Sequence, residues 1–289
     1  MSSPASTAAM DTTPVDRRTA AAIEAAEACA WADMHAAAPA GFARAAGLGA
    51  ETIGGTLVLR WAATGRRYFS RTIGLGVAVP ATAEAIDGVL EHYRRAGITM
   101  FLLQSLPHCR PAEYDGWLLE RGLEPFDAQD RIIRGGEPAP PPLNAPPGRE
   151  LVVERVGPEC SGEWAAFLQR VYRLEAGPWL AALVGRRGWY QYVAREGGEI
   201  VAARGMYIAP GGMAWLGMDG PVPGLGTDDH EPDAAICDVA VRDGLAGGAR
   251  GFLADIEAPS PALDTPAYDR FARLGFRRPY VRTHYARID

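Results

Sequence analysis

WLGMDGPVPGLGTDDHEPDAAICDVAV, at residues 215–241, is the stretch of sequence that decides the fold. It reads as an apolar strand, then a loop punctuated by Pro and Gly, and then the start of a helix. Because the first amides of a helix have no partner within it, a strand, a Gly-bearing turn and a helix N-terminus in this order form a place for an anion such as phosphate. The last residues of the loop, 228–231, are mostly acidic and oppose such binding. The function depends on which influence prevails.

The segments around this stretch alternate between strand and helix patterns. Residues 190–196, 199–209 and 213–219 read as a meander of strands joined by Gly-Gly turns. Further strands are predicted over 251–257 and 280–288, and helices over 163–171, 179–184, 233–246 and 266–274.

The first half of the chain shows the same kinds of pattern. An Ala-rich helix is predicted over 19–38, where helical spacing produces an apolar stripe of Ile23, Ala26, Ala30, Trp31 and Met34. Strands are predicted over 56–61, 68–79, 98–104 and 129–134, and helices over 82–97 and 114–121.

Pro and Gly divide the chain into two parts. Residues 135–148 contain six Pro and three Gly among fourteen residues, which cannot sustain a helix or a strand ladder. We therefore predict a disordered leader over 1–14, an N-terminal domain over 15–134, a Pro-rich linker over 135–149 and a C-terminal domain over 150–289.

Equivalent residues recur in the two parts at a nearly constant offset. Ile86 corresponds to Ile236 at an offset of 150, and Gly122 corresponds to Gly275 at an offset of 153. This order favours two related α/β domains in tandem. The alternative is that two unrelated α/β units share an order of elements.

Composition and charge exclude several classes of function. An apolar content of 48% and a net charge of −6 are typical of a globular protein with neither nucleic acid nor membrane as its main partner. All 29 basic residues are Arg, so the chain has no Schiff-base or P-loop lysine. The four Cys are scattered singly and predict no metal site. The start of the chain lacks the apolar core of a signal peptide, and no run approaches the roughly 18 apolar residues of a membrane helix, so we expect a cytoplasmic location.

The order of elements resembles the GNAT (Gcn5-related N-acetyltransferase) superfamily, in its tandem two-domain bacterial type. Residues 265–285, TPAYDRFARLGFRRPYVRTHY, are similar to its closing motif, in which a helix ends in Gly-Phe before the final strands. Residues 71–97 and the WLLERGL segment resemble the N-terminal unit of tandem GNAT proteins. The resemblance implies an α/β fold of the mixed α+β kind, with two GNAT-like domains, each a mostly antiparallel twisted sheet flanked by helices. It also implies that acyl-coenzyme A binds between two diverging central strands.

The phosphate-binding loop departs from this family. Residues 228–234, DDHEPDA, stand where the family has Q/R-x-x-G-x-G/A, so the Arg and the glycines are missing and Pro232 lacks an amide donor. The resemblance places the donor against Gly217, Met218, Gly224, Gly226, Asp233 and Ala234. Because three carboxylates disfavour a diphosphate, an acyl carrier protein is the alternative carrier of the thioester. The N-terminal domain also lacks the glycines in this position and is expected to be non-catalytic.

Carboxylates at strand ends are the candidates for the general base. Glu257 is the first choice, with Asp219 and Asp255 beside it, because the carboxyl ends of strands face the crevice of an open sheet. The family often places a Tyr five residues before the Phe of Gly-Phe, as general acid to the departing thiolate. Phe271 stands there, and Tyr268, one turn earlier, is the substitute.

Two hypotheses follow. The first is an N-acyltransferase that moves an acyl group from a thioester to the amine of a small molecule, with the C-terminal domain as the catalytic unit. The alternative is a GNAT-fold ligand-binding or regulatory protein without activity.

Overall fold

The computed structural model describes residues 10–142, 150–220, 230–257, 259, 262–263 and 265–288. Its helices are α1 (Arg17–Ala36), α2 (Ala40–Ala46), α3 (Ala83–Arg95), α4 (Tyr114–Glu120), α5 (Ser161–Tyr172), α6 (Gly177–Ala181), α7 (Glu231–Ala246) and α8 (Pro266–Arg273), with the 3₁₀ turns η1 (Arg67–Phe69) and η2 (Pro158–Cys160). Its strands are β1 (Leu48–Ile53), β2 (Thr56–Trp61), β3 (Thr72–Ile73), β4 (Leu103–Ser105), β5 (Glu124–Gly135), β6 (Leu151–Arg155), β7 (Trp189–Glu196), β8 (Glu199–Ile208), β9 (Met213–Gly220), β10 (Gly251–Ile256) and β11 (Arg277–Ala286).

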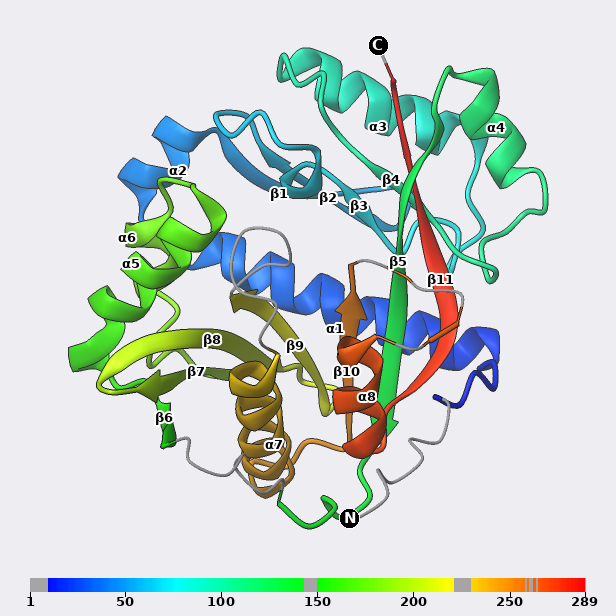
Figure 1. The fold of residues 1–289 in the computed structure, drawn as a ribbon. Helices are drawn as coiled ribbons and strands as arrows, with labels where there is room; N and C mark the ends of the chain where they lie inside the picture. The colour runs from blue at the N-terminus through cyan, green and yellow to red at the C-terminus, as the bar shows by residue number, and fades with distance from the viewer. Residues whose placement is uncertain are drawn as a thin grey trace.

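The strands form two sheets of unequal size, so the predicted mixed α/β fold with mostly antiparallel sheets is confirmed (Figure 1). The small sheet has the order β1-β2-β3, and the large one has the order β4-β11-β5-β10-β9-β8-β7-β6. Strand β5, from the first half of the sequence, lies between β10 and β11 of the second half and is antiparallel to both. The two halves therefore share one sheet, because β5 of the first half and β11 of the second each pair with strands of the other half. These two strands are called the exchanged strands below.

Helix α1 lies between the two halves (Figure 1). Asp16 caps its start by accepting a hydrogen bond from the Thr19 amide at 2.7 Å, as an N-cap residue does. The predicted apolar stripe is confirmed, since all five of its residues are buried. At the far end of the helix, the Met34 carbonyl accepts a bond from the Trp179 indole, and Asp33 pairs with Arg186. The helix thus ties the first half of the chain to the second.

A buried ion cluster joins α1 to the exchanged strands. Glu27 is fully buried and contacts three guanidiniums, those of Arg71, Arg131 and Arg282. These come from the segment before β3, from β5 and from β11, respectively. Burial opposes the charged form, yet the three arginines hold the pKa of Glu27 well below its usual range. Elements distant in sequence therefore meet at one carboxylate.

Two predicted strands of the first half are shorter than expected. Residues 68–79 form only the two-residue strand β3, because Gly74 and Gly76 have positive φ angles of 82° and 80° and turn the chain. Of residues 98–104, only the last two belong to β4.

The ends of the predicted leader and linker can be followed in part. Met10 is buried, and the Asp11 carbonyl accepts a hydrogen bond from the Arg278 amide of β11 at 2.8 Å. After β5, the Pro140 carbonyl accepts a bond from the Arg242 guanidinium of α7. Within the described ranges, no helix has the length and apolar character needed to span a bilayer.

Candidate functional site

The two central strands of the large sheet separate at their C-terminal ends (Figure 1). Strands β9 and β10 are parallel and pair only over residues 213–215 and 251–253. Beyond that point a β-bulge turns β9 aside: Ala203 pairs with Gly220 and Gly205 with Gly217, so the strand has one residue too many opposite Arg204. Met218, in the bulge, has a φ of +53°, which is rare for a residue other than glycine. Residues with such strained backbone conformations are concentrated at functional sites. The gap between β9 and β10 therefore results from the backbone conformation of β9 at the bulge.

Gly217 permits the close packing of this strand end. A Cβ atom at Gly217 would lie 2.1 Å from the Cζ2 atom of the Trp215 ring, so the indole lies across the space that a side chain would need. Trp215 also packs on Trp31 of α1, with ring centroids 5.8 Å apart. The glycine thus allows an aromatic wall to form beside the gap.

We expect Gly217→Ala to destabilise the protein by about 1–3 kcal/mol, because the rigid indole must move out of a packed position. Urea unfolding measures this change. Gly116→Ala is the matched control, since a Cβ there meets nothing within 4 Å and alanine favours the helix α4 that contains it. Equal tolerance of the two substitutions would contradict this account of Gly217.

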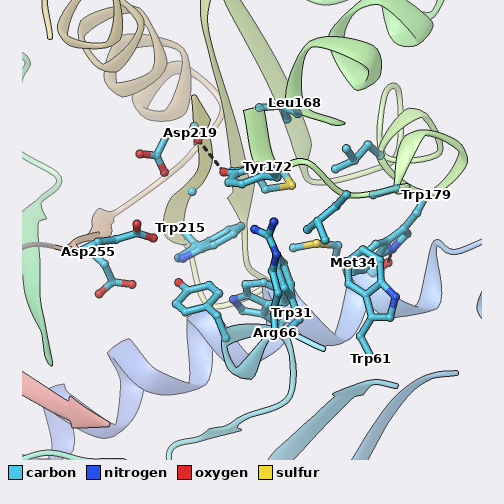
Figure 2. A pocket seen from close by; sticks show the side chains of 18 of the residues that line it. Trp31, Met34, Trp61, Arg66, Leu168, Tyr172, Trp179, Trp215, Asp219 and Asp255 are labelled. Carbon is cyan, nitrogen blue, oxygen red and sulfur yellow. Dashed lines mark hydrogen bonds between the residues drawn. The ribbon is translucent and has the colours of Figure 1, made fainter. Parts of the chain in front are cut away.

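A cavity of about 310 Å³ opens at the gap, between α1, the β2–β3 segment, α5, α6, β9 and β10 (Figure 2). One end is apolar and aromatic. Trp61 and Trp179 meet edge to face there with centroids 5.2 Å apart, and Met34 lies beside them. This end suits a large apolar group of a ligand.

The other end of the cavity is acidic. It contains Asp219 of β9, Asp255 of β10, and Glu257 just beyond β10, so the structure brings together the three carboxylates predicted from the sequence. Asp255 is held by Arg131 and Arg282, at 3.2 and 2.7 Å. Its ion pairs suit it to a structural role in the buried cluster.

Glu257 differs from its two neighbours. Asp219 pairs with Arg204 at 3.3 Å, whereas no hydrogen bond or ion pair engages Glu257 in the described parts of the chain. Its side chain is exposed to water and lines the cavity, whose walls also include Tyr68, Tyr172 and Asp127. Burial by these walls, followed by the charges of Asp219 and Asp255, raises the pKa of Glu257 to about 7. A carboxylate with this pKa exchanges protons readily near neutral pH.

The tyrosines lie differently from the sequence prediction. Tyr268 of α8 is fully buried in the core, outside the cavity, and its hydroxyl donates to Asp130 at 2.5 Å. This position does not support the hypothesis that Tyr268 is a general acid. Two other tyrosines line the cavity: Tyr172 donates to the Asp219 carbonyl at 2.6 Å, and burial raises the pKa of Tyr68 to about 12. Tyr68 keeps its proton at neutral pH, and its hydroxyl accepts a hydrogen bond from Gln129, whereas the Tyr172 hydroxyl already donates one, so Tyr68 is the candidate donor.

The start of α7 does not fit a diphosphate in the way that the family resemblance implies. Asp233 is buried in the first turn and takes up two guanidiniums, with Arg204 at 2.8 Å and Arg270 at 2.5 Å. Burial favours its neutral form, but these arginines lower the pKa of Asp233 to about 2, so the carboxylate is charged. Pro232 contributes no amide donor. A carboxylate of the chain itself thus satisfies the cations of β8 and α8 that face this helix end.

The remaining donor-site predictions have different outcomes. Gly217 and Met218 line the cavity on β9, and Ala234 is buried beside Asp233 in α7. Gly224 and Gly226 lie outside the described residues. The described part of the chain contains no cluster of His, Cys, Asp and Glu side chains arranged to hold a metal ion.

Sequence reasoning missed the walls of the cavity. Trp61 is the last residue of a predicted strand, and Trp179 is the first residue of a predicted helix. Arg66 lies in the irregular segment after β2, and all three residues line the cavity. No pattern in the sequence connects these three positions. The only signal was the aromatic character of the segment 66–69, RRYF.

No family model and no curated protein matches this sequence. The fold, however, matches solved structures. A GCN5-related N-acetyltransferase from Kribbella flavida aligns over 92% of this chain and 94% of its own, with a TM-score of 0.62 and 16% identity. One from Sphaerobacter thermophilus aligns over 80% and 79%, with a TM-score of 0.55 and 14% identity. A tandem GNAT protein from the clavulanic acid biosynthesis pathway aligns over 81% and 78%, with a TM-score of 0.51 and 14% identity. The chain therefore has the GNAT fold in a tandem arrangement, and its activity must be argued from the site.

Proposed function

We propose that this chain, which has the fold of the GNAT N-acetyltransferases, transfers an acyl group from a thioester to the amine of a small molecule. The observation that supports this most directly is Glu257, a carboxylate that has no partner among the described residues and lies at the open end of the β9–β10 gap with a pKa of about 7. A base with a pKa near the working pH is best suited to take a proton from an ammonium group.

The chemistry assigns each element a task. Glu257 accepts a proton from the ammonium group, and the freed nitrogen attacks the thioester carbonyl carbon. Backbone N–H groups of β9 beyond its pairing with β10 stabilise the negative charge that develops on the carbonyl oxygen. The carbon–sulfur bond breaks and the departing thiolate takes up one proton, for which the Tyr68 hydroxyl is the source. The attacking nitrogen gives up its second proton as the amide forms, and this proton restores the tyrosine hydroxyl, so that the net proton released is the one held by Glu257.

The acidic character of this end of the cavity also favours a cationic acceptor. Asp127 of β5 lies there with the carboxylates of β9 and β10. Their combined negative charge attracts an ammonium ion and positions it beside Glu257.

The start of α7, where the family binds the diphosphate of coenzyme A, indicates which molecule carries the thioester. Because Arg204 and Arg270 are engaged by Asp233, a donor gains little from a diphosphate at the start of α7. We expect acetyl-pantetheine to support turnover with a kcat/KM within about tenfold of that of acetyl-coenzyme A, since each tenfold is only about 1.4 kcal/mol.

Thiol release measured with a panel of primary amines tests both points. Amine-dependent release, with the amide identified by mass spectrometry, is the expected result. A thousandfold preference for the coenzyme A thioester would show that a diphosphate site exists elsewhere. Absence of any amide with either donor, or with an acyl carrier protein, would contradict the proposed activity.

One observation favours a second function. Asp233 occupies both Arg204 and Arg270, so these arginines cannot also hold a diphosphate. This arrangement also suits a GNAT-fold binding protein that keeps the cavity but no longer binds an acyl donor. Such a protein binds a small molecule in the cavity but produces no thiol with any thioester, so the same assay combined with calorimetry separates the two functions.

A further inference from the structure

The cavity contains a cation that the proposed transfer reaction does not use. Arg66, just before η1, lines the cavity, and its guanidinium reaches into it near Trp31 and Tyr172 (Figure 2). The side chain is half-buried, and in the described ranges no hydrogen bond or ion pair engages its guanidinium. The arginines of the buried cluster and of the α7 start are all paired, so Arg66 differs from them.

The position of Arg66 divides the cavity into three regions. In Figure 2 its guanidinium lies between the carboxylates of Asp219 and Asp255 on one side and the group of Trp61 and Trp179 on the other. An anionic group of a ligand at Arg66 would therefore have a negatively charged protein surface on one side and an apolar one on the other. A guanidinium can bind a carboxylate through two parallel hydrogen bonds.

The size of the cavity limits the ligand. About 310 Å³ is at the lower end of the range of roughly 300–1,000 Å³ that small-molecule sites span. This volume suits one amino acid and excludes a folded partner or a long peptide. The walls at the apolar end are aromatic rings and the thioether of Met34, which pack well on flat or large apolar side chains.

We propose that the acceptor is a free α-amino acid with a large apolar side chain. This inference rests on the proposed acyl transfer. The ammonium group lies at the acidic end beside Glu257, the carboxylate accepts hydrogen bonds from Arg66, and the side chain packs against Trp61 and Trp179. An α-amino acid carries its ammonium group, its carboxylate and its side chain on one carbon atom, so it can present one group to each of the three regions.

The test compares L-phenylalanine with 2-phenylethylamine, which has the same ring and amine but no carboxylate. With wild-type protein and acetyl-pantetheine, we expect a higher kcat/KM for L-phenylalanine. In Arg66→Gln, we expect the ratio of the two kcat/KM values to fall by about 10- to 100-fold, mainly through the KM of the amino acid, because a charge-assisted hydrogen-bond pair is lost. L-leucine and glycine extend the series, and glycine is expected to be the poorest substrate.

Arg94→Gln is the matched control, because Arg94 is exposed on α3 and its only ion-pair partner in the described parts of the chain is Glu91 of its own helix. The ratio is expected to stay at its wild-type value in this variant. An unchanged ratio in Arg66→Gln, or a wild-type preference for 2-phenylethylamine, would overturn the inference while leaving acyl transfer intact.

Calorimetry distinguishes this inference from the proposed function. If no amine is acylated, Arg66-dependent binding of L-phenylalanine still supports the amino-acid ligand, and only the transfer reaction is lost. Absence of L-phenylalanine binding to the wild-type protein at millimolar concentrations would overturn the inference.

Discussion

Glu27→Ala is expected to lower the free energy of unfolding by about 3–5 kcal/mol, which is the usual cost of removing one partner from a buried ion pair. Glu27 is fully buried and contacts Arg71, Arg131 and Arg282. Its removal leaves positive charge that neither water nor another group compensates, since the two remaining carboxylates, Glu24 and Asp255, already face these arginines. The loss affects α1 and the exchanged strands together.

Denaturant unfolding followed by tryptophan fluorescence measures this loss. Glu91→Ala is the control, because Glu91 also contacts two arginines, Arg94 and Arg95, but on the exposed face of α3. Exposed pairs of this kind contribute about 0–1 kcal/mol, so the control is expected to unfold nearly as the wild type does. Similar effects of the two substitutions would show that the cluster does not hold the halves together.

The same cluster predicts how stability depends on pH. The pKa of Glu27 is depressed in the folded protein, so its contribution is fully present above the unfolded value of about 4.3. The contribution is lost as the pH falls below that value toward the folded pKa. Acid unfolding of the wild type is therefore expected to begin below about pH 4, and Glu27→Gln is expected to show a weaker pH dependence there.

Glu257→Gln is expected to lower kcat by about 10²- to 10⁴-fold, the usual contribution of a general base. The variant keeps the shape of the side chain and removes only its ability to take a proton. In the wild type, the rate is expected to rise as the pH increases through about 7, where Glu257 loses its proton, and to level off above it. In the variant this step is expected to be absent.

Stability separates a catalytic role of Glu257 from a structural one. The pKa of Glu257 is raised in the folded protein, so the contribution of this group to stability is fully present below about pH 4.3 and is lost as the pH rises toward 7. Glu257→Gln is therefore expected to be at least as stable as the wild type at pH 8. Glu154→Gln, on the exposed strand β6, is the control and should keep full activity. A variant of Glu257 that unfolds easily, or that retains the wild-type rate, would contradict the proposed base.

Local patterns predicted much of the fold because they act over a few residues. The stripe of α1, with Ile23 and Trp31, follows from helical spacing, and the meander β7–β9 follows from alternation and Gly-Gly turns. The same patterns failed at residues 68–79, where glycines with positive φ interrupt a β-like composition. They also do not show that Glu24 and Glu27, on the stripe side of α1, are buried, because their partners lie more than 40 residues away in the sequence.

The site was predicted in part for the same reason. Glu257, Asp219 and Asp255 follow from their positions at the ends of adjacent strands, and the sequence predicted that the phosphate-binding loop departs from the family pattern. Arg66, Tyr68 and the tryptophans of the cavity come from elements that have no fixed spacing relative to one another. Their roles depend on contacts that local rules do not contain.

The sequence by itself determined most of the helices and strands, the acidic start of α7 and the carboxylates at the gap, since propensity, capping and strand ends are local properties. Only the tertiary structure decided that β5 enters the large sheet, that Asp233 pairs with Arg204 and Arg270, and that Glu257 has no partner among the described residues, unlike Asp219 and Asp255 beside it. The physical reason is that pairing between charges and packing between distant elements depend on distances in space. The chain determines those distances only when all of its elements are assembled.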